Sequence, residues 1–78
     1  MPIEKLMSVI CVYNEVRIRV EHRRSAETIY LKAARTGEEN ETRNTRVKAV
    51  SKIKDGDIRF ICICGNTINI TIQTKGED

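Results

Sequence analysis

The chain has 78 residues and a net charge of +3, with 40% hydrophobic and 32% charged residues. This length leaves room for a single domain over residues 1–78, and the balance of apolar and charged residues excludes a disordered chain. No apolar run is long enough to span a bilayer, so the sequence also excludes a membrane-spanning helix.

The start of the chain predicts an amphipathic helix followed by a strand. Pro2 suits a first helical turn, and Asn14 marks a stop. Between them, five apolar residues recur at helical spacing, namely Ile3, Leu6, Met7, Ile10 and Cys11. Over residues 16–20 the apolar spacing becomes two, with charged residues between, which indicates a strand with one buried face.

The middle of the chain predicts a second strand and a long loop. Residues 23–27 are polar and indicate a turn, and residues 28–35 follow as the second strand. A short helix over residues 27–35 is the alternative, because two consecutive alanines lie there. Residues 36–45 contain no apolar side chain, so we expect an exposed loop or the tip of long strands.

Three more strands are predicted in the C-terminal half. The third carries its alternating residues at Val47, Ala49, Ser51 and Ile53. Asp55-Gly56 then provides a strong hairpin signal. The fourth strand, residues 58–64, is apolar on both faces and needs cover on both sides. Gly65-Asn66 breaks it, isoleucines alternate along a fifth strand over residues 68–72, and residues 75–78 form a polar tail.

A helix followed by five strands favours a small closed barrel, since an open sheet would expose long edges. We therefore expect a mainly β fold with a short N-terminal helix and connection over residues 1–14. A five-stranded, strongly bent antiparallel barrel, Sm-like or SH3-like, would occupy residues 15–74. The chain has only three aromatic residues, so the core must rely on Ile, Val and Leu, and some apolar surface is left for a partner subunit.

Basic residues gather in two stretches. The first contains Arg17, Arg19, His22, Arg23 and Arg24, and the second contains Arg43, Arg46, Lys48, Lys52 and Lys54. Two interpretations stay open: solvated strand faces, or a surface that meets a polyanion.

The three cysteines indicate free thiols rather than disulfides or a metal site. Their number is odd, and no hydrophobic leader precedes them, so we expect an intracellular protein. Cys62 and Cys64 lie two apart on one face of a strand and lack the turn geometry of a zinc site. We expect no metal and no cofactor.

One segment carries a family resemblance. Residues 61–70 read ICICGNTINI, and this order of apolar strand, Gly-Asn and alternating strand resembles the second motif of the Sm/LSm family of RNA-binding ring proteins. The family has Arg where Cys64 stands. Residues 40–50 resemble its first motif more weakly, with Asn40 in place of Asp. The opening helix and residues 15–21 resemble its N-terminal helix and first strand, and the D-type Sm proteins are the nearest members.

The resemblance implies a subunit of a ring-shaped small nuclear ribonucleoprotein core that acts in mRNA processing and splicing. Single-stranded, uridine-rich RNA would lie between two pore loops, and other Sm-like subunits would pair with the fourth and fifth strands. The residues that it assigns to RNA binding are Asn40, Thr42, Arg43, Asn44, Cys64, Gly65 and Asn66. The location would be nucleus and cytoplasm in a eukaryote, and cytoplasm otherwise.

Several alternatives stay open. The asparagines and Gly65 are also ordinary turn formers. An assembly module that pairs barrel edge strands with a partner chain, without binding RNA, is the main competing function. A binder of duplex DNA through the arginine-rich first hairpin is the third. An enzyme is not expected, because the sole histidine, His22, lies among arginines without a carboxylate pair or phosphate loop.

Overall fold

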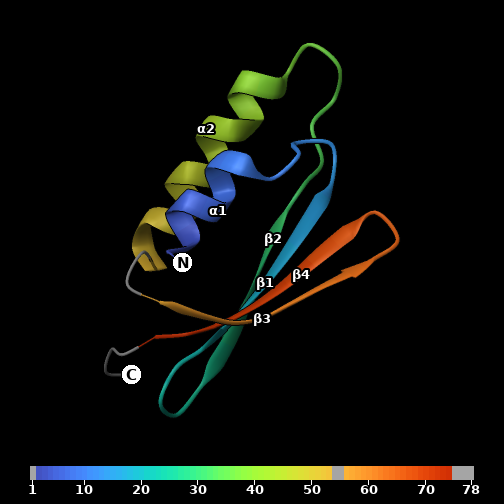
Figure 1. Ribbon diagram of the computed structural model, residues 1–78. Coiled ribbons are helices and arrows are strands. Elements are labelled where there is room, and N and C mark those ends of the chain that lie inside the picture. The colour runs from blue at the N-terminus through green and yellow to red at the C-terminus, as the bar shows by residue number, and fades with distance from the viewer. Residues whose placement is uncertain (1, 54–55, 75–78) are drawn as a thin grey trace.

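A computed structural model describes residues 2–53 and 56–74. In this part of the chain, four strands form one open mixed sheet, and two α-helices lie on one side of it (Figure 1). The elements are α1 (Ile3–Val9), β1 (Glu15–Glu21), β2 (Ala26–Leu31), α2 (Glu39–Val50), the short 3-10 helix η1 (Ser51–Ile53), β3 (Asp57–Cys64) and β4 (Thr67–Gln73). None of the described helices has the length and apolar composition to cross a membrane.

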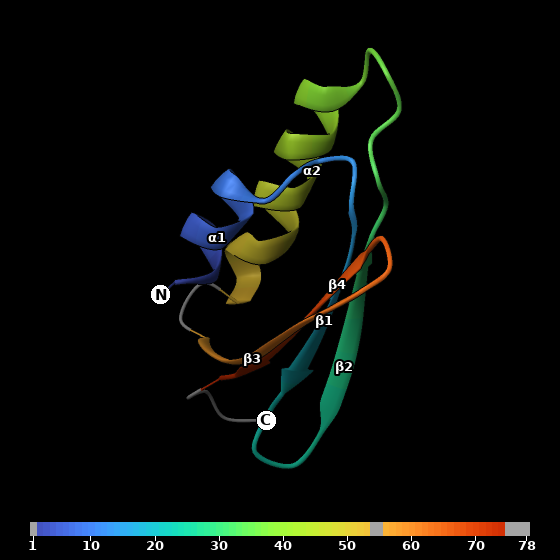
Figure 2. The same ribbon diagram turned by 45° about the vertical axis from the view of Figure 1, so that its right-hand side comes forward.

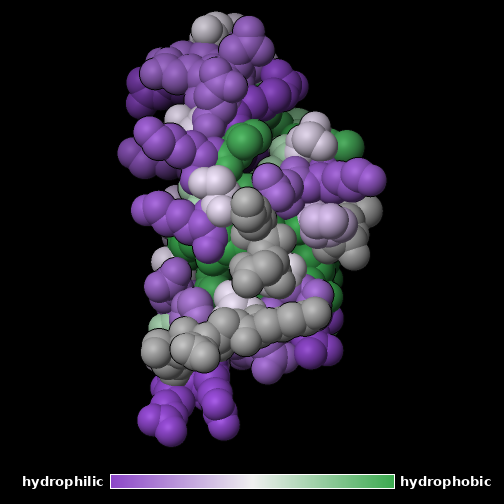
Figure 3. All heavy atoms as spheres, turned by 90° about the vertical axis from the view of Figure 1, so that its left-hand side faces the viewer, coloured by the Kyte–Doolittle hydropathy of each residue, from purple (hydrophilic) through white to green (hydrophobic). Residues whose placement is uncertain are grey.

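The strands lie in the order β2-β1-β4-β3, with β1 and β4 as the central, parallel pair. Each central strand pairs antiparallel with its own hairpin partner at an edge. The helices α1 and α2 pack side by side on one face, and the other face carries no helix (Figure 2). Seen from the helix side, hydrophilic side chains cover the end where α2 begins, and hydrophobic ones show nearer the middle (Figure 3).

The core lies between the sheet and the helices. The register sets β1 beside β4 in three apolar pairs, Val16 with Ile68, Ile18 with Ile70 and Val20 with Ile72. Because side chains alternate across a strand, all six point to the helix face. The helical segments and β2 supply the cover through Ile3, Met7, Val50, Ile53 and Leu31.

The predicted five-stranded closed barrel is wrong. The described residues form four strands in an open sheet, and the segment predicted as the third strand lies in α2 and η1. The parallel pairing of β1 with β4 prevents the all-antiparallel closure that a barrel of this type needs. The helices, rather than a curled sheet, cover the apolar face of the strands.

The expected loop over residues 36–45 is also wrong from Glu39 onward, because α2 begins there. The buried positions of α2 and η1 are Arg46, Val50 and Ile53, at the helical spacing of four and three. Because one of these buried residues is an arginine, the hydrophobic pattern of the sequence does not show the helical periodicity. The second strand ends at Leu31 rather than at residue 35, and Ala34 instead donates its backbone N–H to the carbonyl of Val12.

The other predicted elements are confirmed. These are the N-terminal helix, the strand after Asn14, the doubly apolar strand and the final alternating strand with its Gly65-Asn66 turn. The helix ends at Val9, so Ile10 and Cys11 of its predicted apolar stripe lie beyond it. The predicted Asp55-Gly56 hairpin needs a strand before it, and helical residues stand there instead. Asp55 and the predicted tail over residues 75–78 lie outside the described residues. Gly56 donates its N–H to the carbonyl of Ile53.

Candidate nucleic-acid interface

The RNA-binding residues implied by the Sm resemblance fall into two separate groups. Asn40, Thr42, Arg43 and Asn44 lie in the first half of α2, whereas Cys64, Gly65 and Asn66 lie at the turn between β3 and β4. No hydrogen bond within residues 2–53 and 56–74 joins the two groups directly. Since one of the two expected pore loops is a helix, the arrangement of two loops around a base has no counterpart here.

The Gly65-Asn66 turn is fastened to the connection between α1 and β1. Asn14 Nδ2 donates to the side-chain oxygen of Asn66 at 2.9 Å, and Asn66 Nδ2 donates to the carbonyl of Tyr13 at 3.1 Å. The Tyr13 hydroxyl in turn donates to the carboxylate of Glu39 at the start of α2. These contacts give Asn66 a structural role.

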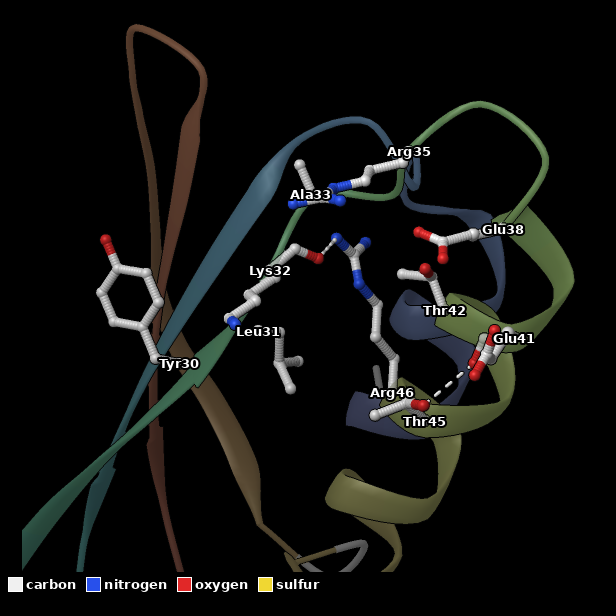
Figure 4. A pocket seen from close by; sticks show the side chains of 10 residues that line it. All are labelled: Tyr30, Leu31, Lys32, Ala33, Arg35, Glu38, Glu41, Thr42, Thr45 and Arg46. Carbon is white, nitrogen blue, oxygen red and sulfur yellow. Dashed lines mark hydrogen bonds between the residues drawn. The ribbon is translucent and has the colours of Figure 1, made fainter.

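Arg46 holds three segments together from inside the protein. Its side chain is 1% exposed and lies between α2 and the end of β2 (Figure 4). The guanidinium donates to the carbonyls of Cys11, Val12 and Asn14 in the α1–β1 connection, and to the carbonyl of Lys32 at 2.9 Å. Burial lowers the pKa of Arg46. Arg46 was predicted as part of the second basic stretch, but it therefore stabilises the fold and does not contribute to the charge of the surface.

A hollow of about 480 Å³ lies beside Arg46. Its charged lining is mixed and includes Lys32 and Arg35 as well as Glu38 and Glu41. Because both signs are present and the Arg46 Nη donors are taken by backbone carbonyls, this hollow has no clear preference for an anion.

The open face of the sheet presents a regular array of polar, basic and aromatic side chains. Register sets Tyr30, Arg17, Asn69 and Cys62 in one row across the four strands, and Thr28, Arg19, Thr71 and Phe60 in the next. Alternation puts both rows on the face opposite the helices. We call these eight residues the open-face array.

Arg17 and Arg19 lie at the centre of the array. The guanidinium carbon of Arg17 lies 5.2 Å from the centre of the Tyr30 ring, in cation–π geometry. Arg19 forms an ion pair with Glu21, Nε to Oε2 at 3.2 Å, and both side chains remain largely in solvent. A hollow of about 300 Å³ is lined by the two arginines together with Thr28, Asn69 and Thr71.

The β3 side of the array is apolar and carries two thiols. Phe60 is 60% exposed, and the sulfur atoms of Cys62 and Cys64 lie 3.7 Å apart. The contact with Cys64 raises the pKa of the Cys62 thiol above its ordinary value of 9.0, so Cys62 is protonated at neutral pH. Among the described residues, no group of three or more His, Cys, Asp or Glu side chains could hold a metal ion.

Sequence reasoning found part of this surface. The alternation in β1 predicted that Arg17 and Arg19 share a solvent face, and they do. It missed Tyr30, Phe60, Asn69 and Thr71 as their neighbours. The signal was the same alternation in each strand, but local pattern does not specify which strands lie side by side.

Comparisons with protein-family models, with curated proteins and with solved structures gave no match. The Sm resemblance therefore stays a prediction.

Proposed function

We propose that this protein binds single-stranded RNA on the open face of its sheet. The observation that carries the proposal is the exposed row in which Arg17 lies against Tyr30, next to the row of Arg19 and Phe60. This moves the RNA contact from the expected pore loops to the sheet. The expected ring depended on the barrel and is not part of the proposal.

Two exposed aromatic rings provide stacking surfaces. Tyr30 on β2 is 52% exposed and Phe60 on β3 is 60% exposed, at opposite edges of the same face. Sheet surfaces that bind single strands stack bases on such rings, and each stacked base contributes about 1–3 kcal/mol. A single strand crossing the face from β2 to β3 would meet one ring near each edge.

The charges between the rings suit a phosphate backbone. Arg17 and Arg19 lie on β1, two residues and therefore about 7 Å apart along the strand. Arg23 and Arg24 extend the positive surface to the exposed β1–β2 turn. Glu21 partly offsets Arg19, so Arg17 is the stronger phosphate or base contact.

Side chains that can read a base edge or a ribose hydroxyl lie in the same two rows. Asn69 offers an amide donor and acceptor, and Thr28 and Thr71 offer hydroxyls around the hollow beside the arginines. Contacts of this kind to the 2′-OH would favour RNA over DNA.

The test is fluorescence anisotropy of labelled oligo-uridine, titrated with wild-type protein and with Arg17→Ala and Tyr30→Ala. Tyr30→Ala should weaken binding about 5- to 150-fold, because one base loses its stacking partner. Tyr30→Phe retains the ring and should bind within about twofold of the wild type. Lys5→Ala, which removes an exposed charge from α1, is the matched control for Arg17→Ala.

Salt dependence and competitors separate the open alternatives. For a single strand, log K should fall with log salt by about 0.7 per phosphate contact, so Arg17→Ala should reduce the slope by about 0.7. Stronger binding of duplex DNA would favour the DNA-binding alternative. No binding of oligo-uridine by the wild type would contradict the proposal and leave the assembly module.

A further inference from the structure

The outer side of β3 is an unpaired sheet edge. β3 pairs only with β4, and apart from a single bridge between Pro2 and Asp57 no described segment covers its other side. Backbone N–H and C=O groups along such an edge can accept another strand. Pairing at this edge does not depend on RNA binding by the open face.

The second half of β3 leaves this edge unprotected, whereas Asp57, Arg59 and a β-bulge between Ile58 and Phe60 lie in its first half. Residues 60–64 carry no charge, and Phe60, Ile61 and Ile63 are 60%, 46% and 67% exposed. Natural edge strands usually carry lysine, proline or inward-pointing charges that prevent pairing. The opposite edge, β2, has Glu27 within it and Lys32 directly after it. The uncharged residues 60–64 of β3 are therefore the part of the edge that is open to pairing.

We propose that β3 pairs antiparallel with β3 of a second copy of this chain. A two-fold axis at Ile61 would set Ile61 against its own copy, and Phe60 against Cys62 of the other copy, so that apolar residues meet on both faces. Both of these pairs join residues of the same sheet face, as a continuous sheet requires. Such an interface is self-complementary and closes at two subunits.

The charges at the start of β3 select the antiparallel direction. Asp57 and Arg59 are the charged residues of this strand. Parallel pairing in register would set each beside its own copy, and like charges directly opposite are destabilising. Antiparallel pairing puts the two Asp57 side chains at opposite ends of the interface. In this register each Arg59 lies opposite Ile63 of the other copy, so antiparallel pairing sets no like charges against each other.

The area available predicts a weak dimer. The three exposed apolar side chains leave on the order of 300 Å² on each copy, judging from the surface that such side chains bury. With the backbone, the total is about 1,000 Å², below the size of most stable interfaces. We expect a weak, concentration-dependent equilibrium between monomer and dimer.

The dimer would join the two open faces into one eight-stranded surface. Phe60 of each copy would then lie near the centre of this surface, beside a thiol of the other copy, and the pairs of Arg17 and Arg19 would lie on either side. A strand of RNA longer than one sheet could thus cross both copies.

The test is sedimentation velocity of the full chain over a range of concentrations, for the wild type and for Ile63→Lys. The wild type should shift from monomer to dimer, and Ile63→Lys should stay monomeric up to at least tenfold higher concentration. Val9→Lys is the matched control, because Val9 is 74% exposed on α1 and should leave the dimer intact. Circular dichroism checks that each variant is folded. A wild type that remains monomeric near 1 mM, or an Ile63→Lys variant that still dimerises, would overturn the proposal.

A second measurement does not depend on the lysine variant. With Cys62 as the only cysteine, after Cys11→Ser and Cys64→Ser, a short bismaleimide should link two copies efficiently. With Cys11 as the only cysteine, linking should be at least tenfold slower. Equal rates would contradict pairing through β3. Arg17→Ala should still dimerise, so failure of RNA binding and failure of pairing are read separately.

Discussion

The most unusual single residue is Arg46, a buried cation whose acceptors are all backbone carbonyls. Its aliphatic stem fills a place in the helix row that an apolar residue would otherwise occupy. Its guanidinium donates hydrogen bonds to carbonyls in the α1–β1 connection and after β2. These carbonyls belong to residues outside the helices and strands. One residue thereby serves both packing and polar satisfaction.

Arg46→Met should lower the free energy of unfolding by about 2–4 kcal/mol, since the buried carbonyls lose a charged donor. Urea unfolding followed by circular dichroism measures this change. Arg43→Met, three residues earlier on the exposed side of α2, is the control and should change stability by less than about 0.5 kcal/mol. An equal loss of unfolding free energy in the two variants would contradict the stabilising role of the Arg46 hydrogen bonds.

The contact between Tyr13 and Glu39 makes stability depend on pH. The hydrogen bond from Tyr13 lowers the pKa of Glu39 below its ordinary value of 4.5, and the carboxylate raises the pKa of Tyr13 above 10.0. Because the pKa of Glu39 is lower in the folded protein than in the unfolded chain, its carboxylate stabilises the fold fully at pH values above the unfolded pKa. This stabilisation is lost as the pH falls through the pKa of the folded state. The raised pKa of the Tyr13 hydroxyl stabilises the fold fully below the unfolded value of 10.0. This stabilisation is lost as the pH rises through the pKa of the folded state.

Glu39→Gln should therefore melt at a lower temperature than the wild type at pH 7, and the difference should shrink below pH 4. Melting curves at several pH values test this, with Glu41→Gln on the exposed side of α2 as the control. A difference between wild type and Glu39→Gln that is constant from pH 3 to pH 7 would rule out the carboxylate as its origin.

At the level of elements, the two hairpins and the first helix were predictable from local chemistry. Gly65 has a φ of +59° and Asn66 a negative φ, a pattern typical of a type II′ hairpin turn. Glycine adopts this backbone without strain, so the sequence marked the turn correctly.

Gly65→Ala should lower the free energy of unfolding by about 1–2 kcal/mol, because an added Cβ meets no neighbour there and the loss comes from the backbone conformation alone. Urea unfolding again provides the measurement. No loss in Gly65→Ala would contradict the assigned turn.

The helix α2 shows where local reasoning failed. Alternation from Val47 to Ile53 indicated a strand, yet Val47 is exposed and the buried residues follow helical spacing through Arg46. Hydrophobic periodicity cannot reveal a helix whose central buried residue is an arginine. In the same way, Arg17 and Arg19 were predicted as surface residues, but their aromatic and amide neighbours come from strands distant in sequence.

For the whole molecule, the pairing of β1 with β4 decides everything that distinguishes this fold from the expected barrel. It places β1 and β4, whose apolar residues alternate, at the centre under the helices, leaves β3 at an edge and opens one complete face to solvent. No local signal marks a pairing between strands about fifty residues apart, which is why five strands in order suggested closure instead. The open-face array and the free edge of β3 both follow from this topology.

The most direct test of the proposed RNA contact is an NMR titration of isotope-labelled protein with oligo-uridine. We predict that the largest chemical-shift changes fall on Arg17, Arg19, Tyr30, Phe60 and Asn69, while the amides of α2 stay unchanged. Changes confined to residues 40–44 and 64–66, or no changes with oligo-uridine in excess, would contradict binding on the open face.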